Sequence, residues 1–234
     1  MHPAFSVIFF TTLIGAGQGL FLALVLTQAL TSIGFPPQDN RSFYALGAAI
    51  SLLLLGAGLI ASFFHLGRPE RAWRTAAKWR TSWLSREVIV LPVLMAIVFL
   101  YGLAHFSGWR DGWPGLLAAA GTVVCLILFV CTGMIYACIR FLQEWATPLT
   151  LVNYFLLGIA SGFTLATAFS AWTAPALTEL FGYYAIVFTF SALLTRIASL
   201  IRNARLKPKS TIQTATGIKH PKVVQKSQGF MGGS

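Results

Sequence analysis

Six long apolar runs dominate this sequence, and they limit the folds that are open to the chain. An α-helix needs about 20 mostly apolar residues to cross the hydrocarbon core of a bilayer. Six segments meet that length: Ala4–Leu30, Phe43–Phe64, Ser85–Phe106, Pro114–Phe141, Leu149–Trp172 and Leu180–Ile201. Only 10% of the residues are charged, against about 25% in soluble domains. We therefore expect an all-α membrane protein in which residues 1–205 form a polytopic bundle of about six transmembrane helices.

The first span combines a retained N-terminus with a glycine face. The opening MHPAFSVIFF lacks the basic region that begins a signal peptide, so we expect it to start the first helix. Gly15, Gly17 and Gly19 follow in this span, and Gly158 and Gly162 lie in the fifth. Glycines at this spacing let helix backbones approach closely in lipid, so we interpret them as a packing feature.

Basic residues are unevenly distributed between the two ends of the spans. We call the end that carries the N-terminus side A and the opposite end side B. With six spans, side A also carries the basic Leu66–Leu84 connection, the turn near Leu142–Pro148 and the segment after the last span. Of the 17 Lys and Arg residues, only Arg41 and Arg110 fall on side B. Membrane topology therefore explains the net charge of +11 without nucleic-acid binding. The positive-inside rule predicts that side A, with both termini, faces the cytoplasm of a bacterial inner membrane.

The segment after the last span differs sharply in composition from the six apolar runs. It is rich in Lys, Gly and Pro and is too polar to span a membrane. A segment with so little apolar surface is disordered alone or becomes ordered on a partner. We expect residues 206–234 to form a polar cytoplasmic tail that contacts a partner subunit.

Few ionisable groups lie in the spans, and each is a functional candidate because burying such a group in a membrane is costly. His65 ends the second span and Glu87 begins the third, both on side A. We predict that these two proton carriers are catalytic. The residues predicted to bind a cofactor are drawn from four spans and the basic connection: Gln18, His65, Arg68, Arg71, Glu87, Tyr136 and Arg140.

This set of residues fits the chemistry of a quinone. The carbonyl oxygens of a quinone become negative on reduction and then accept two protons. A group that titrates near neutrality is a natural local proton donor. The alternative is that Arg68, Arg71, Arg86 and Glu87 are ordinary interfacial anchors and ion pairs.

We expect neither haem nor a metal site in this protein. A b-type haem needs an axial pair, usually two histidines on facing helices. The sequence has four histidines: His2, His65, His105 and His220. No two of them lie well inside different spans at one depth. The three cysteines form no CxxC pair and are interpreted as small buried packing residues: Cys125, Cys131 and Cys138.

Several segments resemble the membrane anchor subunits of the dimethyl sulfoxide (DMSO) reductase family. They are the opening MHPAFSVIFFTTLIGAGQG, FHLGRPERAWR, WRTSWLSREV, and GMIYACIR followed by Trp145 and Thr147. Within that family the sequence is most similar to the anchors of membrane-bound sulfite dehydrogenases (sulfite:quinone oxidoreductases). The resemblance covers residues 1 to about 205, and FHLGRPERAW with LSRE downstream is its most specific part.

The resemblance implies a haem-free anchor that exchanges electrons with ubiquinone or menaquinone. It also implies two partners, an iron–sulfur subunit with four [4Fe–4S] clusters and a molybdopterin catalytic subunit. The histidine and the acid that handle quinol in the family map to His65 and Glu87. Such a protein is an enzyme only as the quinone-reactive subunit of an oxidoreductase complex, with no substrate-oxidising site of its own.

Three alternatives and one departure from the family pattern accompany this interpretation. The leading hypothesis is quinone reduction with electrons from sulfite; the alternative within the family is quinol oxidation that supports sulfoxide reduction. Outside the family, the alternatives are a small membrane transporter and a purely structural anchor. Anchors of this family usually have eight spans, whereas this sequence contains six apolar runs of spanning length.

Overall fold

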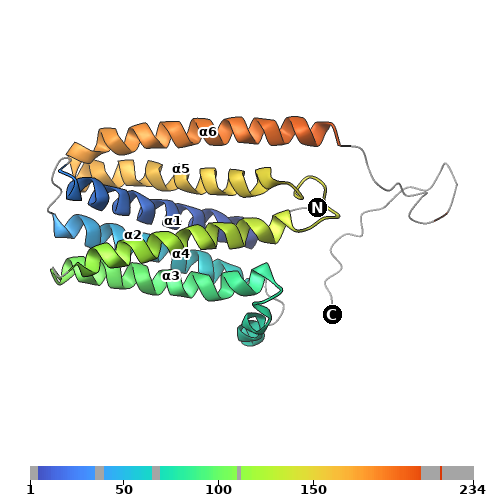
Figure 1. Cartoon of the computed structure of the whole chain (residues 1–234), viewed down its shortest axis with the longest axis horizontal. Helices are drawn as coiled ribbons and strands as arrows, with labels where there is room; N and C mark the ends of the chain where they lie inside the picture. Colours follow the sequence, from blue (N-terminus) through green and yellow to red (C-terminus); the bar gives the residue numbers. More distant parts are fainter. Residues whose placement is uncertain (1–4, 35–39, 65–68, 110–111, 207–216, 218–234) are drawn as a thin grey trace.

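The computed structural model describes residues 5–34, 40–64, 69–109, 112–206 and 217. In this part of the chain, six helices are long and apolar enough to cross a membrane (Figure 1). They are α1 (Phe5–Ser32), α2 (Arg41–Phe63), α3 (Trp83–Phe106), α4 (Trp113–Ala137), α5 (Pro148–Thr173) and α6 (Thr178–Ala204). Two 3₁₀ helices, η1 (Pro69–Lys78) and η2 (Pro175–Leu177), lie in the connections. The expected all-α bundle is confirmed.

Local sequence signals set several helix ends. Asn40 accepts a hydrogen bond from the N–H of Ser42 and caps the start of α2. Thr147 does the same for Leu149 at the start of α5. Short polar side chains of this kind satisfy backbone donors that have no partner inside the helix. Gly112 precedes α4 at φ +76°, a conformation that glycine adopts without strain.

α4 ends four residues before the end of the predicted span, at Ala137 rather than Phe141. The next residues form turns that carry two exposed charged residues, Arg140 and Glu144. Leaving the helix brings both side chains to the end of the bundle, where water can solvate them. The same boundary corrects the interpretation of the cysteines, because Cys138 lies at the helix end and is exposed, whereas the other two are buried.

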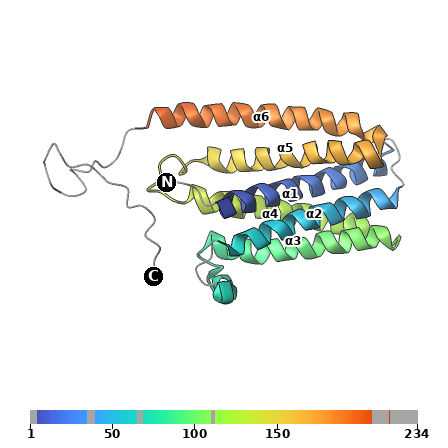
Figure 2. The ribbon, with the colours of Figure 1, turned by 180° about the vertical axis from the view of Figure 1, so that it is seen from behind.

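The helices run alternately up and down, with α1 in the middle (Figures 1 and 2). α1 contacts α2, α4 and α5 and is the most buried of the six helices. α6 packs mainly on α5 and leaves most of its surface to lipid. Side A is the right-hand end in Figure 1, where α1, α3 and α5 begin and where η1 lies.

α1 and α5 cross at the predicted glycine face. A Cβ atom built on Gly15 would lie 3.3 Å from the Cα of Gly158. A Cβ atom built on Gly19 would lie 2.9 Å from the Cα of Gly162. Any larger side chain would force the two backbones apart. The packing interpretation of these four glycines is confirmed.

Polar side chains also join the helices inside the bundle. Ser51 on α2 donates a hydrogen bond to the carbonyl of Gly17 on α1 at 2.8 Å. Asn153 on α5 bonds to Ser199 at 2.7 Å and to Thr195 at 2.8 Å, both on α6. These contacts satisfy polar groups for which lipid offers no partner.

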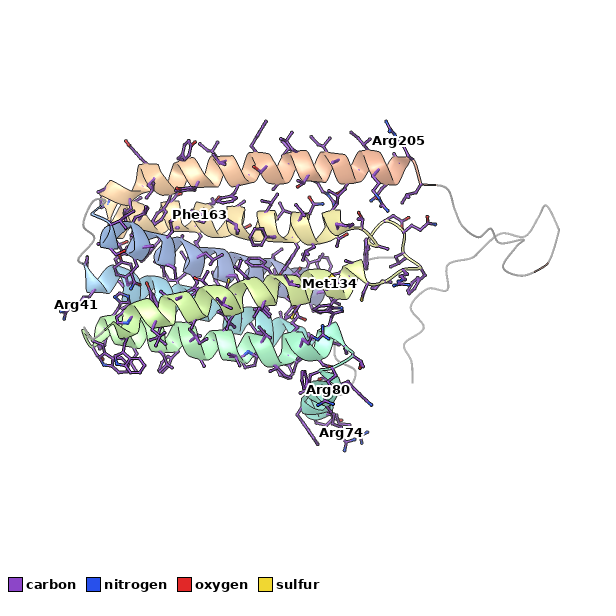
Figure 3. The ribbon with its side chains drawn as sticks, viewed as in Figure 1. Arg41, Arg74, Arg80, Met134, Phe163 and Arg205 are labelled. Atoms are coloured by element: carbon purple, nitrogen blue, oxygen red, sulfur yellow. The ribbon has the colours of Figure 1, made fainter. Side chains whose placement is uncertain are left out.

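The predicted charge asymmetry is present in the structure. Among the described Lys and Arg residues, Arg41 alone lies at side B. Figure 3 shows Arg41 at the opposite end of the bundle from Arg74, Arg80 and Arg205. Which end faces the cytoplasm stays a prediction.

Candidate functional site

Glu87 lies near side A, in the second turn of α3, and only 3% of its surface is exposed. The helix starts after Ser82, whose hydroxyl accepts a hydrogen bond from the N–H of Ser85. Glu87 therefore lies about 6 Å along the helix from Trp83, at 1.5 Å per residue. In the part of the chain that the structure describes, no Lys or Arg forms an ion pair with it. Because an unpaired carboxyl group is costly inside a membrane bundle, Glu87 is a strong functional candidate.

The carboxyl group of Glu87 is held by α4. The hydroxyl of Thr132, itself buried, donates a hydrogen bond to Oε1 of Glu87. Tyr136 lies one turn further along the same face of α4 and interacts electrostatically with Glu87. Tyr154 of α5 lies within the same electrostatic range. The Thr132 hydroxyl is therefore the group that contacts the carboxyl group directly, and the two tyrosines lie within electrostatic range of it.

A cavity of about 290 Å³ lies beside Glu87, among α1, α2, η1 and α3. Glu87, Ser62 and Thr75 are the polar residues of its lining. Most of the wall is apolar and is supplied by Phe10, Leu59, Phe63, Trp73, Val88 and Pro92. Among the described residues, the lining is an apolar wall with one ionisable group, Glu87.

The cavity opens toward lipid. Phe63, Trp73, Leu84 and Val88 line it and are also exposed on the outside of the bundle. The volume of about 290 Å³ lies just below the range of about 300–1,000 Å³ found for ligand pockets, which leaves room for a single substituted ring. A ligand with such a ring and a long apolar tail can place the ring beside Glu87 while the tail stays in lipid.

Two of the arginines that were predicted to bind a cofactor do not line the cavity. Arg71 is exposed on η1, and its Nε atom is 4.0 Å from a carboxylate oxygen of Glu70. Arg140 is exposed in the turn after α4. Neither side chain lines the cavity beside Glu87.

Arg86, the neighbour of Glu87, fixes the start of α3. Its guanidinium group donates to the carbonyl oxygens of Trp79 and Arg80, each at 2.9 Å. It also lies over the ring of Trp83, at 4.2 Å from the centroid. These contacts fit the interfacial-anchor interpretation of Arg86.

Gln18 is buried in the middle of α1 and does not line the cavity. Its amide nitrogen donates a hydrogen bond to the carbonyl oxygen of Cys125 on α4, at 3.0 Å. Its amide oxygen has no partner among the described residues. Gln18 is eight residues from Phe10, which lines the cavity, and so lies about 12 Å further along α1. The hydrogen bond of Gln18 to Cys125 therefore joins α1 to α4.

His65 and Arg68 lie outside the described residues. The segments on either side of them line the cavity, with Phe63 before and Ala72 after. Of the four histidines, the structure describes His105, which lies at side B and stacks on Tyr44 with ring centroids 4.4 Å apart. The expected absence of haem therefore stays a prediction.

Sequence reasoning missed Thr132 and the apolar walls of the cavity. The four-residue spacing of Thr132 and Tyr136 was a usable signal, because it places both residues on one face of a helix. No comparable signal exists for Phe10 and Trp73. They are far apart in the sequence, and only the packing of η1 against the bundle brings them to one cavity.

The sequence matches a known protein family over most of its length. Residues 1–221 match the family model described as DMSO reductase anchor subunit (DmsC). The C subunit of the sulfite dehydrogenase of Allochromatium vinosum is 58% identical over 245 residues, an alignment that covers 100% of this chain and 75% of that protein. No solved structure matches significantly.

Two further relatives are more distant. The C subunit of the anaerobic dimethyl sulfoxide reductase of Haemophilus influenzae is 28% identical over 69% of this chain and 56% of its own length. The YnfH subunit of an anaerobic dimethyl sulfoxide reductase of Escherichia coli is 30% identical over 50% of this chain and 41% of its own length. These two alignments cover roughly half of each relative, so they support the common family rather than a shared complete architecture.

Proposed function

Because the chain belongs to the DMSO reductase anchor subunit family, we propose that it passes electrons between an iron–sulfur partner subunit and membrane quinone. The cavity beside Glu87 is the observation that carries this proposal. It is apolar, opens toward lipid, has the size of one ring and includes a buried carboxyl group. The single substituted ring of ubiquinone matches this size and polarity, and menaquinone, whose head group has two fused rings, is the alternative quinone.

A bound quinone supplies two-electron chemistry that takes up or releases two protons. In this proposal the carboxyl group of Glu87 exchanges a proton at a ring oxygen. Thr132 holds the carboxyl group in place. Phe63 and Trp73 shield the ring from water. We include His65 as the second proton carrier, because it lies two residues after a cavity-lining residue in the sequence.

Arg68 remains a candidate for stabilising negative charge on the ring oxygen, for the same reason of sequence proximity. Tyr136 does not line the cavity, and it is kept as a candidate because it interacts electrostatically with Glu87. Arg71, Arg140 and Gln18 are not included in the proposed site, because they do not line the cavity.

Filling the cavity tests the proposal. Ser62→Phe places a ring in the 290 Å³ space. We expect the KM for a short-chain quinone to rise at least about tenfold in the assembled complex, since a filled pocket excludes the ligand. Ala49→Phe is the matched control, because Ala49 is on the same helix and lines a separate apolar groove between α2 and α3. Equal KM values for Ser62→Phe and the unmodified complex would contradict the proposal.

The proposed partners are a four-cluster [4Fe–4S] subunit and a molybdopterin catalytic subunit, docked at side A. The similarity to a sulfite dehydrogenase subunit at 58% identity favours electron flow from sulfite to quinone. The alternative, quinol oxidation that supports sulfoxide reduction, is favoured by the two more distant relatives. The two directions are separated by two assays of the purified complex. One measures quinone reduction with sulfite as the donor, and the other measures quinol oxidation with DMSO as the acceptor.

Orientation can be tested with a native cysteine. Cys138 is exposed at side A, whereas Cys125 and Cys131 are buried. A membrane-impermeant maleimide should label the protein in inverted inner-membrane vesicles and not in intact spheroplasts, and Cys138→Ser should abolish the label. Labelling in spheroplasts alone would place side A outside the cytoplasm and reverse the proposed topology.

The rival classes make different predictions. A transporter needs a polar path, but Asn153 of α5 is bonded to α6 and does not line the cavity beside Glu87. A purely structural anchor would keep full quinone-coupled turnover after His65→Ala. We expect that substitution to abolish turnover while the complex still assembles on membranes.

A further inference from the structure

The connection between α2 and α3 carries exposed cations that the proposed quinone chemistry does not use. We call residues 69–80, which comprise η1 and the two residues after it, the basic arm. Figures 1 and 2 both show η1 end-on beside the start of α3, so it runs across the bundle axis. In a membrane-embedded bundle, a segment with this direction at this end lies along the bilayer surface.

The side chains of the basic arm differ in polarity and exposure from one row of the 3₁₀ helix to the next. Residues three apart in a 3₁₀ helix lie one above the other. Ala72 and Thr75 share one row and line the cavity, whereas Lys78, the next residue of that row, is exposed. The row containing Arg71 and Arg74 is exposed, and Figure 3 shows Arg74 on the part of the arm away from the bundle. The third row contains Glu70, Trp73 and Trp79, and Trp73 is 71% exposed although it also lines the cavity.

Two exposed tryptophans of the basic arm are each paired with an arginine. Arg74 lies over the ring of Trp73, 5.3 Å from the centroid. Arg80 lies over the ring of Trp79, 5.4 Å from the centroid. An indole ring combines an apolar body with one polar N–H group, and it is enriched where hydrocarbon meets lipid head groups. A guanidinium group beside it is then at the depth of the lipid phosphates.

We propose that the basic arm binds the head groups of anionic phospholipids. Its four exposed cations are Arg71, Arg74, Lys78 and Arg80, and Glu70 is its single carboxylate. Guanidinium groups donate paired hydrogen bonds to phosphate oxygens, and each added cation near a lipid surface strengthens attraction to anionic lipids.

The position of the basic arm favours lipid over an acidic protein as the occupant. The arm lies to the side of α3 rather than over the end of the bundle (Figure 1). The neighbouring outer surface of α3 is apolar and exposed at Val88, Ile89 and Val93. The molecules next to that surface in a membrane are lipids, and their head groups lie level with the arm.

The test uses the full-length protein purified in detergent, with binding of phosphatidylglycerol and phosphatidylcholine measured by native mass spectrometry. We expect selective binding of phosphatidylglycerol. The variant Arg74→Gln/Lys78→Gln/Arg80→Gln should weaken that binding by at least about tenfold, since three cations are lost. These side chains are exposed, so the variant should fold normally.

A second triple variant controls for net charge. Arg140→Gln/Arg196→Gln/Arg205→Gln removes three exposed cations elsewhere at side A, and it should keep phosphatidylglycerol binding close to that of the unmodified protein. Equal loss in both variants would overturn the proposal, because it would show a general charge effect. Unchanged phosphatidylglycerol binding by the arm variant would overturn it as well.

Discussion

The hydroxyl of Thr132 on α4 donates a hydrogen bond to the carboxyl group of Glu87 on α3. Both side chains are almost completely buried, and Glu87 also lines the cavity that opens toward lipid. One hydrogen bond therefore couples the packing of two transmembrane helices to the group that we propose exchanges protons with quinone.

Thr132→Val should destabilise the protein and slow quinone turnover. Val has nearly the same shape but no hydroxyl, so the buried carboxyl group of Glu87 loses its donor. The expected cost is about 1–3 kcal/mol, measured by thermal unfolding of the purified protein, with a parallel fall in quinone turnover by the complex. Thr132→Ser should restore both. Thr167→Val is the control, because the hydroxyl of Thr167 donates to the carbonyl oxygen of Phe163 within its own helix, α5.

Glu87→Gln should separate proton exchange from packing. The amide oxygen still accepts the hydrogen bond from Thr132, but the new side chain no longer exchanges a proton. Loss of a general acid–base group lowers turnover by about 10²–10⁴-fold, and quinone reduction by the assembled complex measures the effect. Glu70→Gln, on an exposed carboxylate of η1, should leave turnover unchanged. Near-normal turnover in Glu87→Gln would exclude a proton-exchanging role for this residue.

Gln18→Leu should leave quinone binding unchanged. Gln18 lies about 12 Å along α1 from the cavity wall at Phe10, and its side chain is hydrogen-bonded to Cys125 of α4. The substitution removes an interhelical bond but also removes a buried oxygen that has no partner among the described residues. The two effects oppose each other, so stability should change by no more than about 1 kcal/mol. A KM for quinone raised severalfold would instead place Gln18 in the site.

Gly162→Ala should disrupt the crossing of α1 and α5. A Cβ atom at this position would overlap the backbone of Gly19, and backbone does not move aside as the end of a flexible side chain does. Overpacking of this kind costs about 1–3 kcal/mol, measured as a lower unfolding temperature and a lower yield of folded protein. Gly56→Ala is the matched control, because the nearest atom to its added Cβ would be 3.8 Å away. Equal stability of the two variants would contradict close packing at Gly162.

Much of the fold follows from the sequence because membrane solvation imposes simple rules. Lengths of apolar sequence predict the spans, since every backbone polar group in lipid must be bonded within a helix. The glycine spacing predicts close-packing faces on α1 and α5, which the structure joins to each other, and counting the spans predicts which helix ends share a side. The end of α4 was missed because an apolar run does not reveal where nearby Arg140 and Glu144 favour turns.

The candidate site was likewise predicted only in part from the sequence. The sequence alone determined that Glu87 is an ionisable residue at the side A end of a span, because a long apolar run follows it and its side follows from counting the spans. Only the tertiary structure decided that Thr132 holds its carboxyl group, that Phe10 and Trp73 enclose a cavity beside it, and that Gln18 joins α1 to α4 instead. These are contacts between distant segments, and they depend on how far each helix is rotated about its axis and how it packs, which hydropathy and charge do not encode.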